Sequence, residues 1–403
     1  MPVKAYPPPA PYPFWLIVFV TGSGTLAIHA FVPALPMIAA DFGVSAGSVQ
    51  LVISAYMLSL AFGQVIYGPL SDRFGRRPVL IAGLCLYATA SIAAALAPNL
   101  ATLIVARMLQ AFGGCAGLTL GRAVIQDTAK DYDAVARMAS VNNFILLSPA
   151  AAPIIGQWLA AAFDWRAIPL ALSLMGWCVA AGTILWLRET SAIRIANFTD
   201  LFSGYLALLR RPRFLAYVAG GALCTTPQFA LLTASPFIVT GTLGRPAWEV
   251  SLFYIVFIAG IISGGLVSRS LVRRMSFERL LAYGSAVAFM MAASLLVQGL
   301  TGTLTVPGFI IPSYLFTVCV GLLSPLTLTR AVSESGTMIG SATGLFGCAQ
   351  MLTASASVVF SGLGGSIFVS TALVLCVTST LGISALAFAV LSARAASGPS
   401  EPA

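Results

Sequence analysis

Twelve long apolar segments constrain the fold of this chain more than any other feature of its sequence. Each is about 20 residues long or more, the length of helix that crosses a hydrocarbon core of roughly 30 Å. Charged residues make up 8% of the 403 residues and the mean hydropathy is +0.95, whereas soluble domains carry about 25% charged residues. The sequence therefore predicts an all-α membrane protein with twelve transmembrane helices.

The spacing of these segments predicts two halves. Short turns join most of them, and the one longer polar connection, 189–213, falls at the midpoint and leaves six spans on each side. The predicted spans are 14–36, 48–69, 78–97, 100–121, 138–161, 167–188, 214–240, 249–268, 280–299, 306–329, 338–362 and 366–391. The predicted domains are a Pro-rich tail at 1–13, a six-helix bundle at 14–188, a cytoplasmic linker at 189–213, a second six-helix bundle at 214–391 and a tail at 392–403.

The positions of Lys and Arg predict the orientation, because cytoplasmic loops carry the excess of positive charge. With the N-terminus inside, all but three of the 21 Lys and Arg residues fall on the cytoplasmic side. Arg166 and Arg245 fall outside, and Arg107 lies within a span. Both termini are expected in the cytoplasm. The net charge of +9 is explained by this topology and by attraction to anionic lipid, so no nucleic-acid partner is expected.

Several other classes of protein lack support in the sequence. The seven cysteines all fall in predicted spans, where they act as small apolar residues, and no disulfide framework or metal site is expected. A single histidine provides neither a metal site nor a catalytic dyad, so the chain is not expected to be an enzyme. The phosphate-binding loop of an ATP-driven pump is absent from the sequence.

A charged hinge, Gly68-Pro-Leu-Ser-Asp72-Arg73-Phe-Gly75-Arg76-Arg77-Pro78, separates the second and third spans. Gly68 is expected to let span 2 approach a neighbour closely, Gly75 to permit a tight turn, and Pro78 to lie in the first turn of span 3. A degenerate copy, Gly264-Gly-Leu-Val-Ser268-Arg269, ends span 8, with Ser268 in place of the acid. This partial repetition is typical of transporter folds built from two related halves.

The hinge resembles the signature of the loop between spans 2 and 3 in the major facilitator superfamily, and twelve spans in two halves fit that fold. Several segments are also similar to the bicyclomycin and chloramphenicol resistance type of drug:proton antiporter. They are Phe31-Val-Pro-Ala-Leu-Pro36, Tyr56 to Pro78, Trp165-Arg-Ala-Ile168, Ala234-Ser-Pro-Phe237 and Gly340-Ser-Ala-Thr-Gly344. The resemblance implies a secondary transporter that works by alternating access.

The same resemblance implies a cytoplasmic latch. Asp72 can accept hydrogen bonds at a helix N-terminus and pair with Arg76. An acid at the cytoplasmic end of span 4, for which Asp127 is the match, would complete a latch that holds the outward-facing state. The expected gate residues are Gly68, Asp72, Arg73, Gly75, Arg76, Arg77 and Asp127. The alternative is that the arginines only enforce topology.

Ionisable side chains are scarce inside the predicted spans. The twelve Asp and Glu residues lie in loops, at span ends or in the C-terminal tail, which leaves His29 in span 1 and Arg107 in span 4. Both are expected roughly 10 Å below the outer surface, at about 1.5 Å per helical residue. An unpaired charge at a helix centre costs roughly 2.5 to 3.5 kcal/mol, so each is expected to face a cavity or a partner.

The resemblance assigns these two residues a place in proton coupling and in the central cavity, together with Gln110. The family carries an acid in span 1 where this chain has His29, while Arg107 and Gln110 match its Arg-x-x-Gln motif. Histidine titrates near pH 6.5, so His29 can take up a proton outside and release it inside. The alternatives are a neutral His29 bonded to a helix carbonyl and an Arg107 that donates to backbone carbonyls of neighbouring helices.

Span 5 and several scattered polar residues supply the remaining candidates. Pro149, Pro153 and Gly156 resemble the antiporter motif Gly-Pro-x-x-Gly-Gly. A helix that is bent by prolines and packed closely through small residues can rock against its neighbour during transport. Close packing without such a movement is the alternative. Gly113, Gly117 and Gly121 in span 4 form a second ridge for close packing. The candidate substrate-cavity residues are Tyr56, Asn142, Asn143, Thr225, Gln228, Phe229 and Tyr314; helix-to-helix hydrogen bonding is the alternative for each.

The sequence as a whole predicts a multidrug or antibiotic exporter of the bacterial inner membrane. It is expected to act as a monomer surrounded by lipid, driven by the proton gradient and without a cofactor. A cavity with an arginine and no acid would suit neutral or anionic drug-like molecules. The alternative is an exporter of one specific metabolite, or a carrier without proton coupling.

Overall fold

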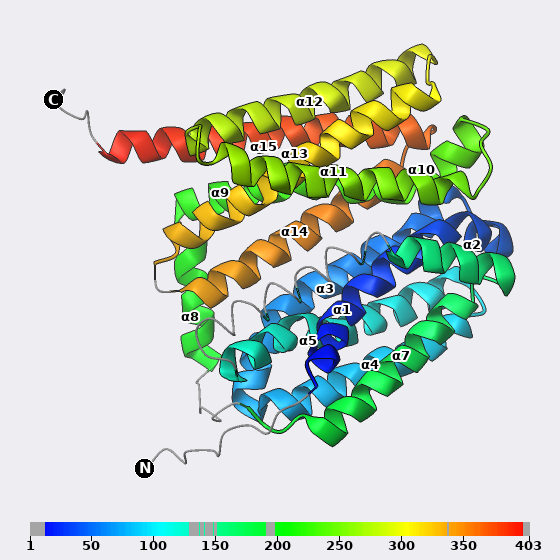
Figure 1. The fold of residues 1–403 in the computed structure, drawn as a ribbon, viewed down its shortest axis with the longest axis vertical. Helices are drawn as coiled ribbons and strands as arrows, with labels where there is room; N and C mark the ends of the chain where they lie inside the picture. Colours follow the sequence, from blue (N-terminus) through cyan, green and yellow to red (C-terminus); the bar gives the residue numbers. More distant parts are fainter. Residues whose placement is uncertain are drawn as a thin grey trace. The chain divides into compact units, whose positions relative to one another are not determined.

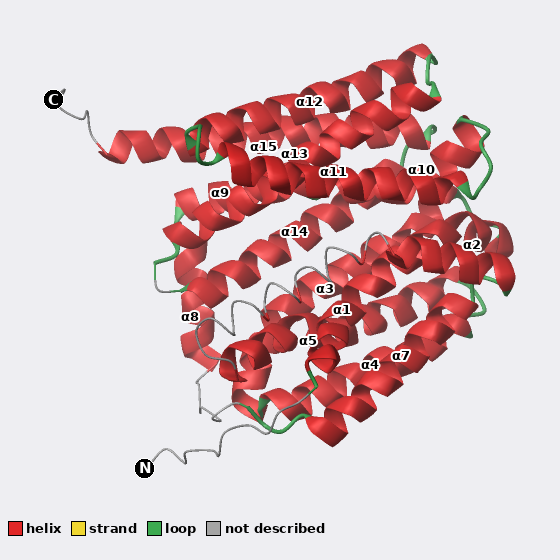
Figure 2. Ribbon diagram, in the orientation of Figure 1, coloured by secondary structure: helices red, strands yellow, loops and turns green. Residues whose placement is uncertain are grey.

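The computed structural model describes residues 13–128, 137, 141, 148, 151–190, 198–336 and 338–397, and the regular elements in these ranges are all helical (Figure 2). The all-helical prediction is therefore confirmed for this part of the chain. The chain divides into two compact units, Met1–Leu201 and Phe202–Ala403. The boundary lies inside the predicted connection 189–213, and this connection holds a helix of its own, Phe198–Leu209.

The first unit is built from long helices that pack side by side (Figure 1). They are α1 (Phe14–Phe31), the short η1 (Val32–Ala34), α2 (Leu35–Phe42), α3 (Ala46–Phe74), α4 (Arg76–Ala95), α5 (Leu100–Thr128) and α7 (Ala167–Trp186). Helix α5 is central, because it packs against α1, α3 and α4, and α7 covers α4. The helix is interrupted between α1 and α2 at Pro33 and Pro36, because proline lacks the N–H that a continuous α-helix needs.

The boundary between the units falls within the linker helix, and the elements from this helix onward form a second set. They are α8 (Phe198–Leu209), α9 (Pro212–Thr225), α10 (Gln228–Phe237), η2 (Ile238–Thr242), α11 (Glu249–Leu271), α12 (Phe277–Thr301), α13 (Val306–Glu334), α14 (Ile339–Gly362) and α15 (Ile367–Ser397). Helix α13 packs against α9, α11 and α12. The apolar core of the second unit includes Leu208, Phe214, Leu323 and Phe346.

Eleven of the described helical segments are long and apolar enough to cross a membrane. The predicted fifth span, 138–161, is described only in part: the described residues in it are 141, 148 and those of the helix Ala151–Ala162. The predicted seventh span, 214–240, is not one regular helix. It breaks between α9 and α10 at Thr226 and Pro227 and ends in the π-helical turn η2.

Glycines bring the helices of the first unit into close contact along α5. A Cβ atom at Gly113 would lie 2.5 Å from the Gly83 carbonyl oxygen, and one at Gly117 would lie 2.1 Å from the Val20 carbonyl oxygen. The predicted ridge in span 4 is thus confirmed as a packing surface. The expectation for Gly68 is wrong, because a Cβ atom there meets no atom within 4 Å in this unit. The close approach of α3 is made instead at Gly63, against Cys115.

Candidate functional site

The hinge (residues 68–78) forms a one-residue link between two helices. Helix α3 ends at Phe74 and α4 begins at Arg76, so Gly75 alone makes the turn. Its φ of 94° and ψ of 153° lie in a region that almost only glycine occupies. Pro78 follows in the first turn of α4, where its missing N–H has no helical partner to lose. The expected roles of Gly75 and Pro78 are confirmed.

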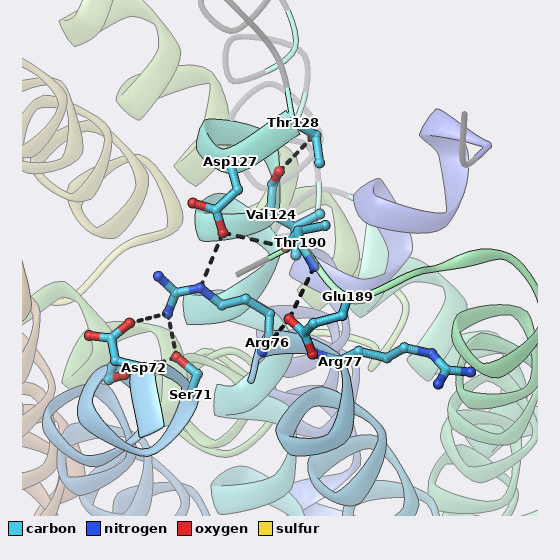
Figure 3. Close-up of polar contacts among 10 residues, drawn as sticks. Ser71, Asp72, Arg76, Arg77, Val124, Asp127, Thr128, Glu189 and Thr190 are labelled. Atoms are coloured by element: carbon cyan, nitrogen blue, oxygen red, sulfur yellow. Dashed lines mark hydrogen bonds and ion pairs between the residues drawn. The ribbon is translucent and has the colours of Figure 1, made fainter. Parts of the chain in front are cut away.

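This tight turn places Arg76 among several acceptors (Figure 3). Its Nη1 lies 2.8 Å from Asp72 Oδ1, one helical turn earlier in sequence, and also donates to Ser71 Oγ. Its Nε lies 3.3 Å from Asp127 Oδ2, near the end of α5. The three residues of the expected latch, Asp72, Arg76 and Asp127, thus form one connected network. Ser71 is an additional member that the sequence did not single out.

Glu189 is the main residue of this network that the sequence reasoning missed. Its carboxylate follows α7 and accepts the backbone N–H groups of Arg76 and Arg77 at 2.9 and 3.2 Å (Figure 3). These are orphan donors at the start of α4, where the helix dipole also favours a negative charge. We expected Asp72 to accept hydrogen bonds at a helix N-terminus, but Glu189 does so, because the side chain of Asp72 is directed to Arg76.

The remaining hinge residues lie around this network. Arg77 donates from Nη2 to the Ile184 carbonyl of α7 at 2.8 Å, so it ties α4 to α7. The guanidinium of Arg73 lies 5.4 Å from the ring centre of Phe74. Thr190 Oγ1 donates to Asp127 Oδ2 at 3.4 Å, which links the segment after α7 to α5. The hinge therefore fastens four segments of one unit: α3, α4, α5 and the end of α7.

The strength of the network comes from the sharing of Arg76 rather than from any single pair. The Arg76 side chain is 17% exposed, and those of Asp72 and Asp127 are 32% and 28% exposed. Ion pairs near water contribute about 0 to 1 kcal/mol each, because solvent screens them and long side chains lose entropy. An arginine already held by one carboxylate and a hydroxyl loses less entropy when it binds a second carboxylate. The pairs are weak enough to break and re-form.

Arg107 lies in the interior of the first unit, with none of its side chain exposed. Its Nη2 donates to the Ala27 carbonyl of α1 at 3.0 Å, and its Nη1 donates to Gln110 Oε1. The guanidinium also faces the rings of Phe31 and Tyr56, at 4.4 and 4.2 Å from their centres. These contacts are those of the alternative interpretation, in which Arg107 donates to the backbone of a neighbouring helix.

Gln110 extends this interior network to α4. Its Nε2 donates to Ser91 Oγ at 2.6 Å, and both side chains are buried. Tyr56 of α3 is fully buried and donates to the Gly24 carbonyl of α1 at 2.9 Å. Tyr56 therefore bonds helix to helix here, which was the alternative to its placement on the cavity wall. Arg107, Gln110 and Tyr56 together join α1, α3, α4 and α5.

His29 is also buried, two residues beyond the carbonyl that Arg107 binds. Its Nδ1 lies 2.8 Å from the Thr25 carbonyl oxygen. A carbonyl only accepts, so Nδ1 carries the hydrogen and Nε2 is the basic nitrogen of the neutral ring. Gly156 of span 5 packs on the next residue of α1, because a Cβ atom at Gly156 would lie 1.9 Å from the Ala30 carbonyl oxygen. Gly156 of the span 5 motif thus packs closely against α1, next to His29 in sequence.

Three of the predicted site residues, Asn142, Asn143 and Pro149, lie outside the described residues. Pro153 is buried in the helix Ala151–Ala162. The structure thus brings together the hinge residues at one end of the first unit, and Arg107, Gln110 and Tyr56 in its interior. The remaining candidates belong to the second unit.

In the second unit, the candidates gather where α9 breaks. Thr225 is buried, donates to the Gly221 carbonyl and accepts a hydrogen bond of 3.3 Å from Gln350 of α14. Gln228 begins α10 and keeps a buried Oε1 that has no hydrogen-bond partner among the described residues. Gln350 is a residue that the sequence reasoning missed. The broken helix and the unpaired Oε1 are the features expected of a polar binding site inside a membrane.

The last two candidates of the second unit, Phe229 and Tyr314, are only partly buried. Phe229, next to Gln228, is half-buried. Tyr314 of α13 is half-buried and donates to Ser263 Oγ of α11 at 3.1 Å. Tyr314 therefore makes the helix-to-helix hydrogen bond that was the alternative to a cavity role.

Comparison with known sequences identifies a family and several proteins that are similar to this chain. The profile of the Major Facilitator Superfamily matches residues 14–358. Multidrug resistance protein D of Escherichia coli is 29% identical over 338 residues, which is 83% of this chain and 84% of the relative. The bicyclomycin resistance protein homolog of Haemophilus influenzae is 26% identical over 276 residues, 68% of this chain and 69% of the relative.

Solved structures show the same fold at low sequence identity. A D-xylose–proton symporter superposes with a TM-score of 0.70 at 16% identity, over 93% of this chain and 95% of its own. A bacterial homolog of the human lysosomal transporter Spinster, in an inward-facing and occupied conformation, gives a TM-score of 0.71 at 14% identity. It covers 97% of this chain and 98% of its own.

Proposed function

Because the chain belongs to the major facilitator superfamily, we propose that it exports drug-like molecules from the bacterial cytoplasm by alternating access, in exchange for protons. Two similar proteins carry names that refer to resistance to several drugs or to bicyclomycin. The observation that carries the proposal is the hinge network of Asp72, Arg76 and Asp127. A set of weak, shared ion pairs suits a latch, because it stabilises one state without trapping it.

The substrate is proposed to be neutral or anionic. The carboxylates of the described residues lie at helix ends, in loops or in the linker helix α8, so none of them lies mid-span to attract a cation. Gln228 supplies a buried acceptor, and Thr225 with Gln350 supplies a second polar group nearby in the same unit. These three side chains can hydrogen-bond a drug without requiring a particular charge.

His29 is the proposed proton carrier. It is the sole histidine of the chain, and the hydrogen bond of its Nδ1 to Thr25 leaves Nε2 as the nitrogen that gains and loses a proton. Protonation would place a positive charge on α1, the helix whose Ala27 carbonyl accepts a hydrogen bond from Arg107. A charged imidazolium is disfavoured in a poorly solvated interior, and His29 is buried, so a bound proton would favour a different arrangement of α1.

A second candidate function is export without proton coupling, or export of one metabolite. The same hydrogen bond from His29 to the Thr25 carbonyl favours it, because a histidine held in this way can be purely structural. The two functions differ in their response to a protonophore, which collapses the proton gradient and stops only the coupled exporter.

The test is a resistance panel in an efflux-deficient bacterium that expresses the wild type, Asp72→Asn, His29→Ala or Arg107→Ala. We expect the wild type to raise the inhibitory concentration of several unrelated compounds, and a protonophore to restore their accumulation. Asp72→Asn and His29→Ala should reach normal membrane levels and give reduced resistance. No raised resistance to any compound, at a confirmed membrane level of the wild type, would refute the proposed export of drugs.

A further inference from the structure

The surface of the second unit contains two apolar grooves that differ in the charge beside them. One, with a volume of about 100 Å³, is lined by residues of η2, α11 and α13, among them Leu252, Phe253 and Val256. Arg245 is also part of its lining, and its guanidinium is paired with Glu249 at 2.7 Å. The local charge at this groove is therefore neutralised.

The other groove, of about 170 Å³, lies between α11, α12 and α13. Its lining consists of nonpolar residues, Tyr283 and a glycine, and includes Leu271, Met275 and Val287. Tyr283 is 60% exposed, so the groove opens to the surface of the unit. Val318 and Leu322 of α13 form its inner wall.

A basic turn, defined as residues 269–279, joins α11 to α12 (Figure 1). It contributes Leu271 and Met275 to the lining of this groove. Arg273 and Arg274 lie between two groove residues, Leu271 and Met275, and both arginines are exposed. The N–H groups of Arg274 and Met275 both bond to the Leu271 carbonyl at 2.9 Å, which folds the turn back on the groove.

Further positive charge surrounds the same place. Arg269 and Arg279 are exposed at the two ends of the turn, and Arg330 of α13 lies 4.3 Å from the ring centre of Phe277. No described carboxylate lies within ion-pair distance of the four arginines of the basic turn, although Glu278 lies in the first turn of α12. Topology alone explains the presence of arginines, but it does not require an apolar groove beside them.

We propose that this groove and the basic turn bind one acidic phospholipid, with an acyl chain along Leu271, Val287 and Val318 and the phosphate on Arg273 and Arg274. A phospholipid combines the two properties that the site offers, an apolar chain and an anion next to it. The first N–H groups of α12 add partial positive charge at the same end. A neutral lipid would meet only the apolar part, and the first groove lacks the unpaired charge.

The proposal is tested by native mass spectrometry of the detergent-purified full chain with added phosphatidylglycerol, or with phosphatidylcholine of the same acyl chains. We expect the double variant Arg273→Gln/Arg274→Gln to bind phosphatidylglycerol about tenfold more weakly or worse and phosphatidylcholine unchanged. Arg273→Lys/Arg274→Lys should retain most of the binding, which separates lost charge from misfolding. Val287→Trp fills the groove and should weaken binding of both lipids.

Matched controls come from the first groove, where Arg245→Gln and Val256→Trp should leave phosphatidylglycerol binding within about twofold of the wild type. Unchanged binding in Arg273→Gln/Arg274→Gln would overturn the proposal. So would full competition by free glycerol 3-phosphate, which would indicate a simple anion site. A dimer that disappears in the double variant would assign the groove to a second copy of the chain instead.

Discussion

The two halves of the chain carry related turns, one between α3 and α4 and one between α11 and α12, and the two turns differ in structure. In the first unit, one glycine links α3 to α4, and Arg76 contacts Asp72 and Asp127. In the second unit, residues 272–276 separate α11 from α12, and Ser268 stands where the acid would be. The first turn is thus a closed ion network, whereas the second is an exposed basic surface.

The difference shows that an acid and a short link act together. With an acid one turn before the arginine and a single residue between the helices, the guanidinium is held against its own unit. Without them, the arginines of the second turn extend outward and remain available for another anion. The second turn, with Ser268 in place of an acid, therefore leaves its positive charge available to a different partner, which we propose to be lipid.

The largest effect on this comparison is expected from Gly75→Ala. An alanine at φ 94° is strained by about 1–3 kcal/mol, and its Cβ atom would lie 2.5 Å from Glu189 Oε2, so the carboxylate that caps α4 must move. We expect a lower melting temperature of the purified protein and a loss of most export. The control is Gly265→Ala in the second half, where a Cβ atom meets nothing within 4 Å. Equal effects of the two substitutions would contradict the account.

A smaller effect is expected from Glu189→Gln. The amide keeps one acceptor for the N–H groups of Arg76 and Arg77 but loses the charge, which is worth about 1 kcal/mol at a helix N-terminus. Thermal unfolding of the purified protein measures the change, with Glu278→Gln as the control at the start of α12. A loss in Glu278→Gln as large as that in Glu189→Gln would show that the cap on α4 is not special.

Asp72→Asn is expected to alter transport more than stability. It removes one of the two carboxylates from Arg76, which changes the balance between transport states by about 0.5–1 kcal/mol, or roughly two- to fivefold. Export rates should fall while the amount of protein in the membrane stays constant, and Ser268→Ala should change neither. Full export activity in Asp72→Asn would remove the latch from the account.

The smallest effect is expected from Thr190→Ala. This substitution removes a hydrogen bond of 3.4 Å to Asp127 and leaves both ion pairs of Arg76 in place. The loss of stability should stay below about 0.5 kcal/mol, as measured by thermal unfolding. A loss larger than that of Glu189→Gln would reverse the order of importance proposed here.

Much of this fold could be predicted because its signals are local. Apolar runs predict spans, and the pair formed by Asp72 and Arg76 follows from four-residue spacing on one helix. Glu189 could not be found in this way, because 113 residues separate it from Arg76, whose N–H group it binds. Asp127 was found only through resemblance to a family. Helix α8 was missed because the connection was identified by its polarity, and polarity does not exclude a short helix.

The interior residues show the same limit. Composition singled out His29 and Arg107 as unusual, but it could not say that Arg107 contacts the rings of Phe31 and Tyr56, which lie on two other helices. The break before α10 has a visible sequence signal in Pro227, yet a long apolar run concealed it. Side chains that meet across helices depend on packing, which hydropathy does not record.

The central claim, drug export in exchange for protons, is tested most directly in inside-out membrane vesicles with an imposed pH gradient. The vesicle lumen corresponds to the outside of the cell, so an acidic lumen should protonate His29 and drive drug inward. We predict that the gradient accelerates drug uptake in the wild type, and that this acceleration disappears with a protonophore or in His29→Ala. Equal acceleration in His29→Ala, or none in the wild type, would contradict the account.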